Sequence, residues 1–244
     1  MQLRDYQINI CKKLGRAISS GKRRILLSAP VGAGKTVVFT DFAKRIASIG
    51  MATLIITDRV ELLKQTVRHG TKECPFGVLR PDKFAPNTVT VAMLQTLRSR
   101  LKSEQYQDWL SNFQVIIIDE IHQMVNGNTY QMICDFCSDE CSIVGITATP
   151  WDCRGFLLRG FDEFINEVEI RDLIERGFLV KPNHLTIDLF DFSRVKVTST
   201  GDYDSGAIDD IVVDTDKIDK VFDLWSQHAR HKKTLAFCAT VKSA

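Results

Sequence analysis

The chain has 244 residues, 44% of them apolar and 25% charged, with a net charge of +2. This composition is ordinary for a globular protein with a substantial buried core. Its small net charge excludes a basic tail, so any nucleic-acid binding has to come from local positive patches. No apolar run approaches the roughly 20 residues that cross a bilayer, which excludes a membrane span.

The first residues and the cysteines indicate a cellular compartment. The segment from Met1 to Asp5 carries no signal-peptide pattern, and the cysteines number seven, an odd count. Free thiols are typical of a reducing environment. We therefore expect a cytoplasmic protein that does not associate with membranes.

Helical and strand-like patterns alternate from Gln7 to about Pro150, which predicts an α/β fold with a parallel sheet between helices. The segment 74–87 contains three prolines and is predicted to be a loop. The expected helices are 6–20, 36–48 and 59–70, and the expected strands are 25–28, 53–57, 89–92, 115–118 and 142–146.

The pattern changes after Lys181. Residues 185–189 alternate like an edge strand, residues 199–206 are polar and turn-rich, and residues 209–227 have a helical pattern with an acidic first turn. We expect the first domain to end near Pro182.

Residues 29–36 match most of the phosphate-binding pattern G-x-x-x-x-G-K-[ST], with Ala29 in place of the leading glycine. Gly32, Ala33 and Gly34 would let backbone amides converge on phosphate oxygens. Lys35 would contact the β- and γ-phosphates and the Thr36 hydroxyl would bind Mg²⁺. The alternative is a glycine turn that happens to precede a lysine.

Two carboxylates follow the continuous apolar run 115–118. Such a run is typical of a central parallel strand, and ligands of open α/β sheets bind at the carboxyl ends of the strands. Asp119 would hold Mg²⁺, directly or through water, and Glu120 would orient the attacking water. The alternative is a pair of acids that merely ends a strand.

The tetrad Asp-Glu-Ile-His, residues 119–122, and the later Thr-Ala-Thr-Pro, residues 147–150, complete a set with the phosphate loop. With these motifs the chain resembles the first RecA-like, P-loop NTPase domain of a superfamily 2 helicase or translocase of the DExH group. The resemblance implies that Lys35, Glu120 and His122 are catalytic. It also implies that Thr147, Ala148 and Thr149 couple hydrolysis to domain movement, and the alternative for these residues is ordinary strand-end hydrogen bonding.

Further motifs carry the resemblance along the chain. Arg4 and Gln7 lie in a segment similar to the family's adenine-recognition motif, and Gln7 can offer a base edge both a donor and an acceptor. Arg59, in Thr-Asp-Arg, and Gln95 with Thr96 lie in segments that resemble those gripping the nucleic-acid backbone. ATP and Mg²⁺ are the implied cofactors. DNA is preferred over RNA because the chain resembles phage and restriction-type members.

The resemblance also implies a domain organisation: 1–182 as the first RecA-like domain, 183–232 as an inter-domain region and 233–244 as the incomplete start of a second RecA-like domain, which would begin with a strand at residues 234–238. In this family the second domain supplies arginines that neutralise charge on the γ-phosphate. We find no such arginine motif here, so we expect this chain to bind ATP and Mg²⁺ but to hydrolyse slowly and not to unwind nucleic acid without the second domain.

Two other functions share these motifs. One is a double-stranded DNA translocase of a restriction or repair complex, and the other is a nucleotide-binding interaction module without motor activity.

Three side-chain clusters leave their roles open. Arg98, Arg100 and Lys102 suit either backbone phosphates or a solvated helix face. Trp151 and Phe156 suit either base stacking or the core. Cys134, Cys137 and Cys141, with Cys153 or His122, suggest zinc, but their spacing also fits one buried side of a helix.

Overall fold

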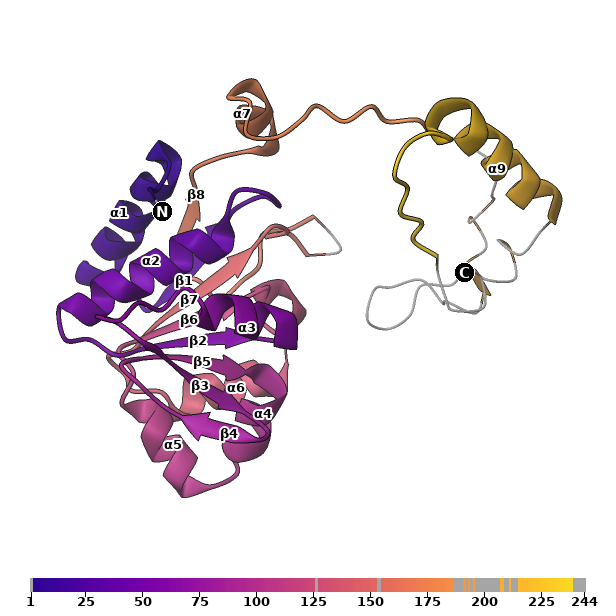
Figure 1. Ribbon diagram of the computed structural model, residues 1–244. Coiled ribbons are helices and arrows are strands. Elements are labelled where there is room, and N and C mark those ends of the chain that lie inside the picture. Colours follow the sequence, from indigo (N-terminus) through magenta and orange to yellow (C-terminus); the bar gives the residue numbers. More distant parts are fainter. Residues whose placement is uncertain are drawn as a thin grey trace. The chain divides into compact units, whose positions relative to one another are not determined.

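The computed structural model describes residues 2–125, 127–152, 155–186, 191, 193, 195, 207–208, 211 and 215–238. The chain forms two compact units, residues 1–181 and 182–244 (Figure 1). Within the described ranges no helix is long and apolar enough to cross a membrane.

The first unit is built on an eight-stranded sheet with the order β4-β3-β5-β2-β6-β7-β1-β8. Every neighbouring pair is parallel except β3 and β4, which are antiparallel. The strands are β1 Arg24–Ser28, β2 Thr53–Thr57, β3 Phe76–Arg80, β4 Lys83–Ala85, β5 Val89–Met93, β6 Val115–Asp119, β7 Ser142–Thr147 and β8 Glu163–Asn166.

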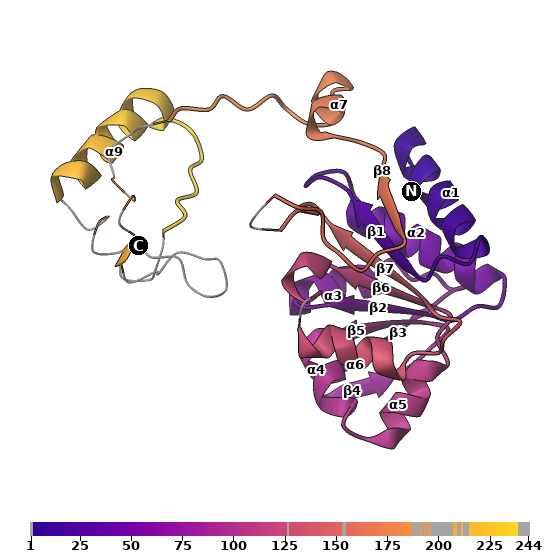
Figure 2. The same ribbon diagram turned by 180° about the vertical axis from the view of Figure 1, so that it is seen from behind.

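Helices cover both faces of this sheet, as the two opposite views show (Figures 1 and 2). One apolar core lies between the sheet and α1 (Asp5–Ser19), α2 (Lys35–Ser48) and α3 (Val60–Val67). The other core lies against α4 (Leu94–Arg100), α5 (Glu104–Ser111) and α6 (Asn128–Phe136). The central strands β2, β5 and β7 are buried throughout because both of their faces are covered. The predicted α/β fold is confirmed.

Strand register brings the polar residues of three strands to one edge of the sheet. Asp119 at the end of β6 pairs with Ile146, and Thr147 at the end of β7 pairs with Ser28 of β1. The loop after β1, the acidic pair after β6 and the threonines after β7 therefore emerge side by side. This is the edge where open α/β sheets bind ligands.

The predicted elements before residue 150 agree with the structure, with one clear exception. The strand 53–57 has the predicted bounds, and the others differ by a residue or so. The helix predicted over 59–70 ends earlier, at Val67, because the amides of His69 and Gly70 close turns onto Thr66 and Val67 instead of continuing the α-helical pattern.

The exception is the segment 74–87, where the prediction of a loop is wrong. This segment forms β3, paired in parallel with β5, and β4, which turns back along β3. Its three prolines misled the prediction because they flank the strands: Pro75 precedes β3, Pro81 separates β3 from β4, and Pro86 follows β4. Proline is tolerated at such positions, where it removes no ladder hydrogen bond.

The sheet also extends beyond the predicted end of the alternating pattern. After Pro150 the chain forms β8, which pairs in parallel with β1 at the edge of the sheet. The short helix α7 (Ile170–Glu175) follows and buries Leu173. A strand of four residues with mixed burial gives too weak an alternation to be recognised from sequence.

In the second unit the longest element is α9 (Thr215–Ala229), which agrees with the described part of the helix predicted over 209–227. Residues 234–238, expected to begin a strand, have no strand pairing within the described ranges. A strand needs a neighbour, and none of the described residues supplies one. Residues 187–190, 199–206 and 239–244, on which other expectations fall, lie outside the described residues.

Candidate functional site

The phosphate loop joins β1 to α2 and has the backbone that its glycines predict. Gly32 and Gly34 adopt left-handed angles, with φ of 84° and 79°. A Cβ atom at Gly32 would lie 2.6 Å from Leu179 Cδ2, and one at Gly34 would lie 2.7 Å from Gln7 Nε2. Any side chain here would therefore be both strained and crowded. Lys35 and Thr36 open α2, whose first amides have no intrahelical partner and favour an anion.

The segment before α1 is attached to this loop. Tyr6 Oη and Gln7 Nε2 both donate to the carbonyl of Ala33, at 2.9 and 3.0 Å, and Gln7 Oε1 accepts from the amide of Arg4 at 2.9 Å. Gln7 is only 5% exposed. Gln7, which was predicted to read a base edge, thus uses one of its donor and one of its acceptor positions within the protein. These hydrogen bonds hold the phosphate loop against α1.

The acidic pair after β6 is joined directly to the loop lysine. Lys35 Nζ lies 3.0 Å from Glu120 Oε1, and the Lys35 side chain is only 13% exposed. Glu120 has a φ of 50°, the only left-handed angle among the described residues that are not glycine. Such a conformation costs a residue with a Cβ about 1–2 kcal/mol. The fold therefore uses a strained backbone to hold this carboxylate opposite Lys35.

Asp119 occupies a different environment from its neighbour. Burial, together with the charge of Glu120, raises the pKa of the Asp119 carboxyl to about 6, whereas Lys35 acts in the opposite direction. Its Oδ1 accepts the Glu120 amide at 3.1 Å. A carboxylate that is costly to ionise in a half-buried site is suited to bind a cation, because the cation offsets that cost.

His122 connects the acidic pair to the threonine motif. Its Nδ1 lies 2.8 Å from Thr147 Oγ1 and 3.4 Å from Glu120 Oε2. Thr147 Oγ1 in turn accepts the amide of Thr149 at 2.9 Å, across Ala148. The Ala29 amide donates to the Thr147 carbonyl at 3.0 Å, which links the threonine motif to the phosphate loop. Lys35, Glu120, His122, Thr147 and Thr149 thus form one connected network.

Gly145 in β7 supports this network and was not singled out from the sequence. A Cβ atom at this position would lie 2.8 Å from Ile121 Cγ1. Ile121 is fully buried between the acidic pair and His122. A glycine inside a strand often marks a close approach, and that signal was present in the sequence.

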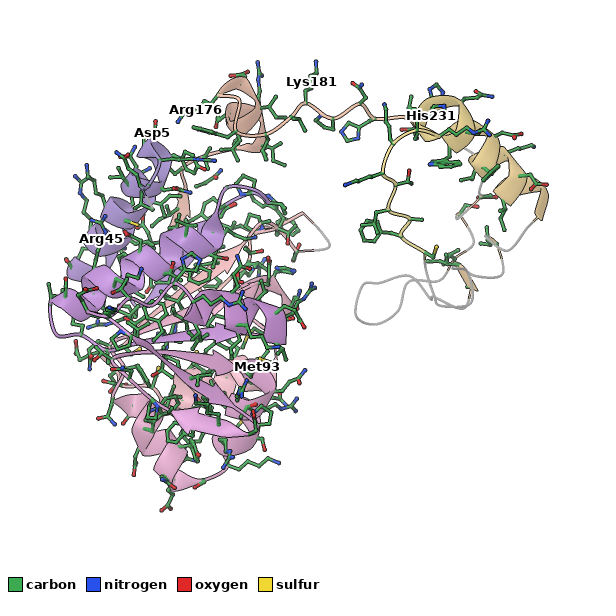
Figure 3. The ribbon with its side chains drawn as sticks, in the orientation of Figure 1. Asp5, Arg45, Met93, Arg176, Lys181 and His231 are labelled. Atoms are coloured by element: carbon green, nitrogen blue, oxygen red, sulfur yellow. The ribbon has the colours of Figure 1, made fainter. Side chains whose placement is uncertain are left out.

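The segment after α7 is a second contribution that sequence analysis did not include. The Arg4 guanidinium lies 4.0 Å from the centroid of the Phe178 ring, and the Leu179 side chain packs over Gly32. Arg176 forms an ion pair with Asp5 at 2.8 Å, and Figure 3 labels both residues. The end of the first unit therefore packs on its beginning, beside the phosphate loop. These contacts join residues far apart in sequence, so no local sequence pattern predicts them.

The residues predicted to contact nucleic acid lie at the ends of two neighbouring strands. Arg59, after β2, is exposed and lies 3.9 Å from Asp58. Gln95 and Thr96 open α4 after β5, the strand that pairs with β2. A groove lies here, lined by Val60, Pro81, Met93, Gln95, Thr96, Ser99 and Arg100. The structure thus places these predicted residues at the carboxyl ends of β2 and β5, on the same edge of the sheet as the network around Lys35.

Among the open clusters, the two aromatic residues are not in the core: Trp151 and Phe156 are each 56% exposed, although Trp151 contacts the Phe164 ring. Arg100 lies over the Tyr106 ring and lines the groove described above. Arg98 and Arg100 lie in the last turn of α4.

The thiols do not share one helix as predicted. Cys134 lies in α6, Cys137 caps its end and Cys141 precedes β7, because α6 stops at Phe136. Among the described residues no group of three or more histidine, cysteine or acidic side chains is arranged to hold a metal ion. Cys153 lies outside the described residues.

A parallel sheet between helices, with a phosphate loop, an acidic pair and a threonine motif at one edge, defines a RecA-like motor domain of the superfamily 2 helicases. The chain belongs to the family described as Type III restriction enzyme, res subunit (ResIII), whose model matches residues 1–152. ATP-dependent motor domains characterise this class, so nucleotide use follows from membership.

Two curated relatives match at least 90% of this chain and extend beyond it. The putative mitochondrial ATP-dependent helicase irc3 of Schizosaccharomyces pombe is 27% identical over 99% of this chain and 42% of its own length. A 51.5 kDa protein of a Lactococcus phage is 27% identical over 90% of this chain and 44% of its own length. The chain therefore spans less than half the length of these relatives.

Solved structures support the fold alone. The UvsW helicase of bacteriophage T4 superposes with a TM-score of 0.50 and 19% identity, over 68% of this chain and 60% of that one. The Type ISP restriction-modification enzyme LlaGI, solved with a DNA substrate mimic, superposes with a TM-score of 0.53 and 17% identity, over 73% of this chain and 21% of that one.

Proposed function

We propose that this chain is the ATP- and Mg²⁺-binding motor domain of an ATP-dependent nucleic-acid helicase that acts on DNA. The observation that carries the proposal is the contact between Lys35 and Glu120, made across a phosphate loop with two left-handed glycines. We also propose residues 1–182 as the motor domain, 183–232 as an inter-domain region and 233–244 as the start of a second RecA-like domain.

The residues present suit a triphosphate and its cation. The loop amides of Gly32 to Thr36 and the Lys35 ammonium would bind phosphate oxygens, and a Cβ at either glycine would crowd the side chains packed on this loop. Asp119 and the Thr36 hydroxyl would hold Mg²⁺, which commonly takes only one or two protein ligands. When bound, Mg²⁺ neutralises charge on the transferred phosphoryl group.

The resting ion pair suggests how binding and hydrolysis are ordered. While Lys35 donates to Glu120, that carboxylate is partly neutralised. A triphosphate competes for the same ammonium, which frees Glu120 to accept a hydrogen bond from the attacking water. His122, between Glu120 and Thr147, would then report the state of Glu120 to the threonine motif. Tyr6, Arg4 and Gln7 would fix the loop beside the base.

The nucleotide-binding part of the proposal is tested by calorimetric titration of the chain with ATP and Mg²⁺. Lys35→Ala should weaken binding by about 10- to 100-fold, because charge-assisted hydrogen bonds contribute about 1.5–3 kcal/mol. Lys13→Ala is the matched control, since Lys13 also pairs with a glutamate, Glu167, but lies on α1. Glu120→Gln should still bind ATP yet lose turnover. Equal affinities of the two lysine variants would contradict the assigned site.

The nucleic-acid part is tested on the full-length protein, because the chain alone is expected to hydrolyse slowly. ATP turnover is measured with single-stranded DNA, duplex DNA and RNA in turn. We expect DNA to stimulate turnover more than RNA, and Arg59→Gln to reduce that stimulation while leaving ATP affinity unchanged. ATP binding without stimulation by any of these polymers would favour a nucleotide-binding interaction module instead.

A second candidate, a double-stranded DNA translocase, is favoured by the family description. A translocase moves along duplex without separating its strands. On the full-length protein, displacement of a triplex-forming strand without duplex unwinding would support the translocase, and unwinding would support the helicase.

A further inference from the structure

A second groove adjoins the one that contains Gln95 and Thr96. It lies between α3 and the β3–β4 hairpin and is lined by three apolar side chains, Leu63, Val67 and Val78, and four basic ones, Lys64, Arg68, Arg80 and Lys83. The two grooves adjoin because Val60 and Leu63 lie one turn apart on α3, and because Arg80 and Pro81 are neighbours in the chain. Both α3 and α4 contact β3.

The charge of this second groove is one-sided. None of the described residues lining either groove is acidic, and Arg100 adds a further cation at the end of the first. Among the described residues, the only acid paired with these cations is Asp82, whose carboxylate lies 2.9 Å from Arg80. Lys64, Arg68 and Lys83 are exposed, and none of them forms an ion pair with another residue in the part of the chain that the structure describes. Cations gathered without counter-charges repel one another, and an anionic ligand relieves that repulsion.

The shape of the groove favours a linear polyanion over a single phosphate. Its apolar floor can pack against sugar rings, while the basic side chains stand on both sides, on α3 and on the hairpin. From Val60 to Arg68 the helix runs about 12 Å at 1.5 Å per residue, which corresponds to about three to four nucleotides of a duplex strand at 3.4 Å each. One strand can therefore pass from Gln95 and Thr96 along α3.

We propose that Lys64, Arg68, Arg80 and Lys83 form a basic groove that binds the sugar–phosphate backbone of DNA, as a continuation of the contacts of Arg59, Gln95 and Thr96. This inference rests on the proposed nucleic-acid function and extends it from Arg59 along α3 and onto the β3–β4 hairpin. Because its contacts go to phosphates, binding should be strongly salt-dependent and indifferent to sequence. The hairpin that sequence analysis assigned to a loop would thus have a function of its own.

The test measures binding of the 244-residue chain to fluorescein-labelled DNA by anisotropy. Single-stranded and duplex probes of about 20 nucleotides exceed the site size of a typical single-strand binding module. The salt concentration is varied between about 50 and 200 mM, the range in which counterion release is large. The test variant carries Lys64→Gln and Arg68→Gln, both at exposed positions. The control carries Lys12→Gln and Arg16→Gln, which remove the same charge from α1.

The test variant should bind at least about tenfold more weakly at low salt. Its slope of log affinity against log salt should fall by about 1.8 for the duplex or about 1.4 for the single strand, because each lost phosphate contact contributes about 0.9 or 0.7. The slope change is measured with both probes, and the probe that shows the larger change is the form of DNA that occupies the groove. Lys83→Gln should reduce the slope by about half as much.

The failures are distinguishable. If the unsubstituted chain binds DNA and Arg59→Gln weakens it, but the groove variant keeps the original slope, the inference is wrong and the proposed function stands. An equal loss in the α1 control would likewise overturn the inference. If the unsubstituted chain binds neither probe, or binds polyglutamate instead, both the inference and the proposed nucleic-acid function are wrong.

Discussion

The two edges of the parallel sheet, formed by the carboxyl and the amino ends of its strands, hold charged side chains in opposite ways. At the carboxyl ends, Asp119 carries a carboxyl whose pKa is raised by burial, and Glu120 has a left-handed backbone. At the amino ends, Asp162 accepts the amides of Arg24 and Arg23 at 2.9 Å each, and these hydrogen bonds lower its pKa. At the carboxyl ends, burial disfavours the charged form of the carboxyl group. At the amino ends, hydrogen bonds from backbone amides stabilise the charged form.

This difference shows where the fold sacrifices stability. The amino ends satisfy their backbone groups with side chains, as when Ser142 Oγ donates to the Lys22 carbonyl at 3.0 Å and Gln114 Oε1 accepts the Ala52 amide at 2.7 Å. The carboxyl ends keep strained and half-buried groups side by side. Strain of this kind persists only where the surrounding structure imposes it, and such sites are commonly functional.

The largest expected effect sharpens the contrast at two glycines with similar backbone angles. Gly34 and Gly50 have φ of 79° and 82°, but a Cβ at Gly50 meets nothing within 4 Å. Gly50→Val should cost about 1–2 kcal/mol of strain, and Gly34→Val should cost about 1–3 kcal/mol more because it also overpacks against Gln7. Urea denaturation measures both, and titration with ATP should show loss of binding only for Gly34→Val. Equal destabilisation would contradict a crowded phosphate loop.

A smaller effect is expected beneath the acidic pair. Gly145→Ala should destabilise the protein by about 1–3 kcal/mol, the usual cost of overpacking, since the new methyl group would meet Ile121. It should also slow ATP turnover by displacing Glu120 and His122. Ile121→Ala removes the two Cγ atoms that the new methyl group would meet. In a double-mutant cycle the double variant should therefore lose less stability and less turnover than the sum of the two single variants. Strictly additive effects would show that the contact between these residues is unimportant.

Effects of similar or smaller size are two pH dependences of opposite sign, measured with a chelator present. The pKa of Asp119 is about 6 in the folded protein, above its ordinary value of 3.8. Its ionisation therefore destabilises the fold, and this loss develops as pH rises from about 4 to about 6. Asp119→Asn should abolish the loss and raise stability at pH 7 by roughly 1–3 kcal/mol.

Asp162 provides the opposite case. Because its folded pKa is lowered, its stabilising contribution is complete above its unfolded pKa of about 3.9 and disappears as pH falls through the folded value. Asp162→Ala should lower stability at neutral pH and have little effect in strong acid. Thermal unfolding across this pH range measures both variants. The same sign for both would contradict the comparison between the two ends.

Much of the first unit could be predicted from sequence because its information is local. The apolar runs 53–57 and 115–118 predict two buried strands, and the glycines predict the phosphate loop. In each case the signal lies in a few consecutive residues. The phosphate loop, the acidic pair and the threonine motif could be assigned to one edge because parallel strands end together.

The remainder depends on contacts between distant residues. β3 and β4 were missed because prolines at strand ends look like prolines in a loop, and β8 because its few residues show no alternation. The packing of Leu179 on Gly32 and of Ile121 on Gly145 joins positions that no sequence spacing relates. Lys35 and Glu120 were each predicted to be catalytic, but their ion pair was not predicted. It follows only from the register of β1, β7 and β6.

The bond from the Ala29 amide to the Thr147 carbonyl has a consequence for how this protein is dissected. Both atoms belong to the main chain, so substitution of the Ala29 or Thr147 side chain would leave this link intact. Replacing the Ala29 amide by an ester, through chemical ligation, would remove the donor and little else. The main-chain link between the phosphate loop and the threonine motif could then be tested apart from the link through His122, without altering a single side chain.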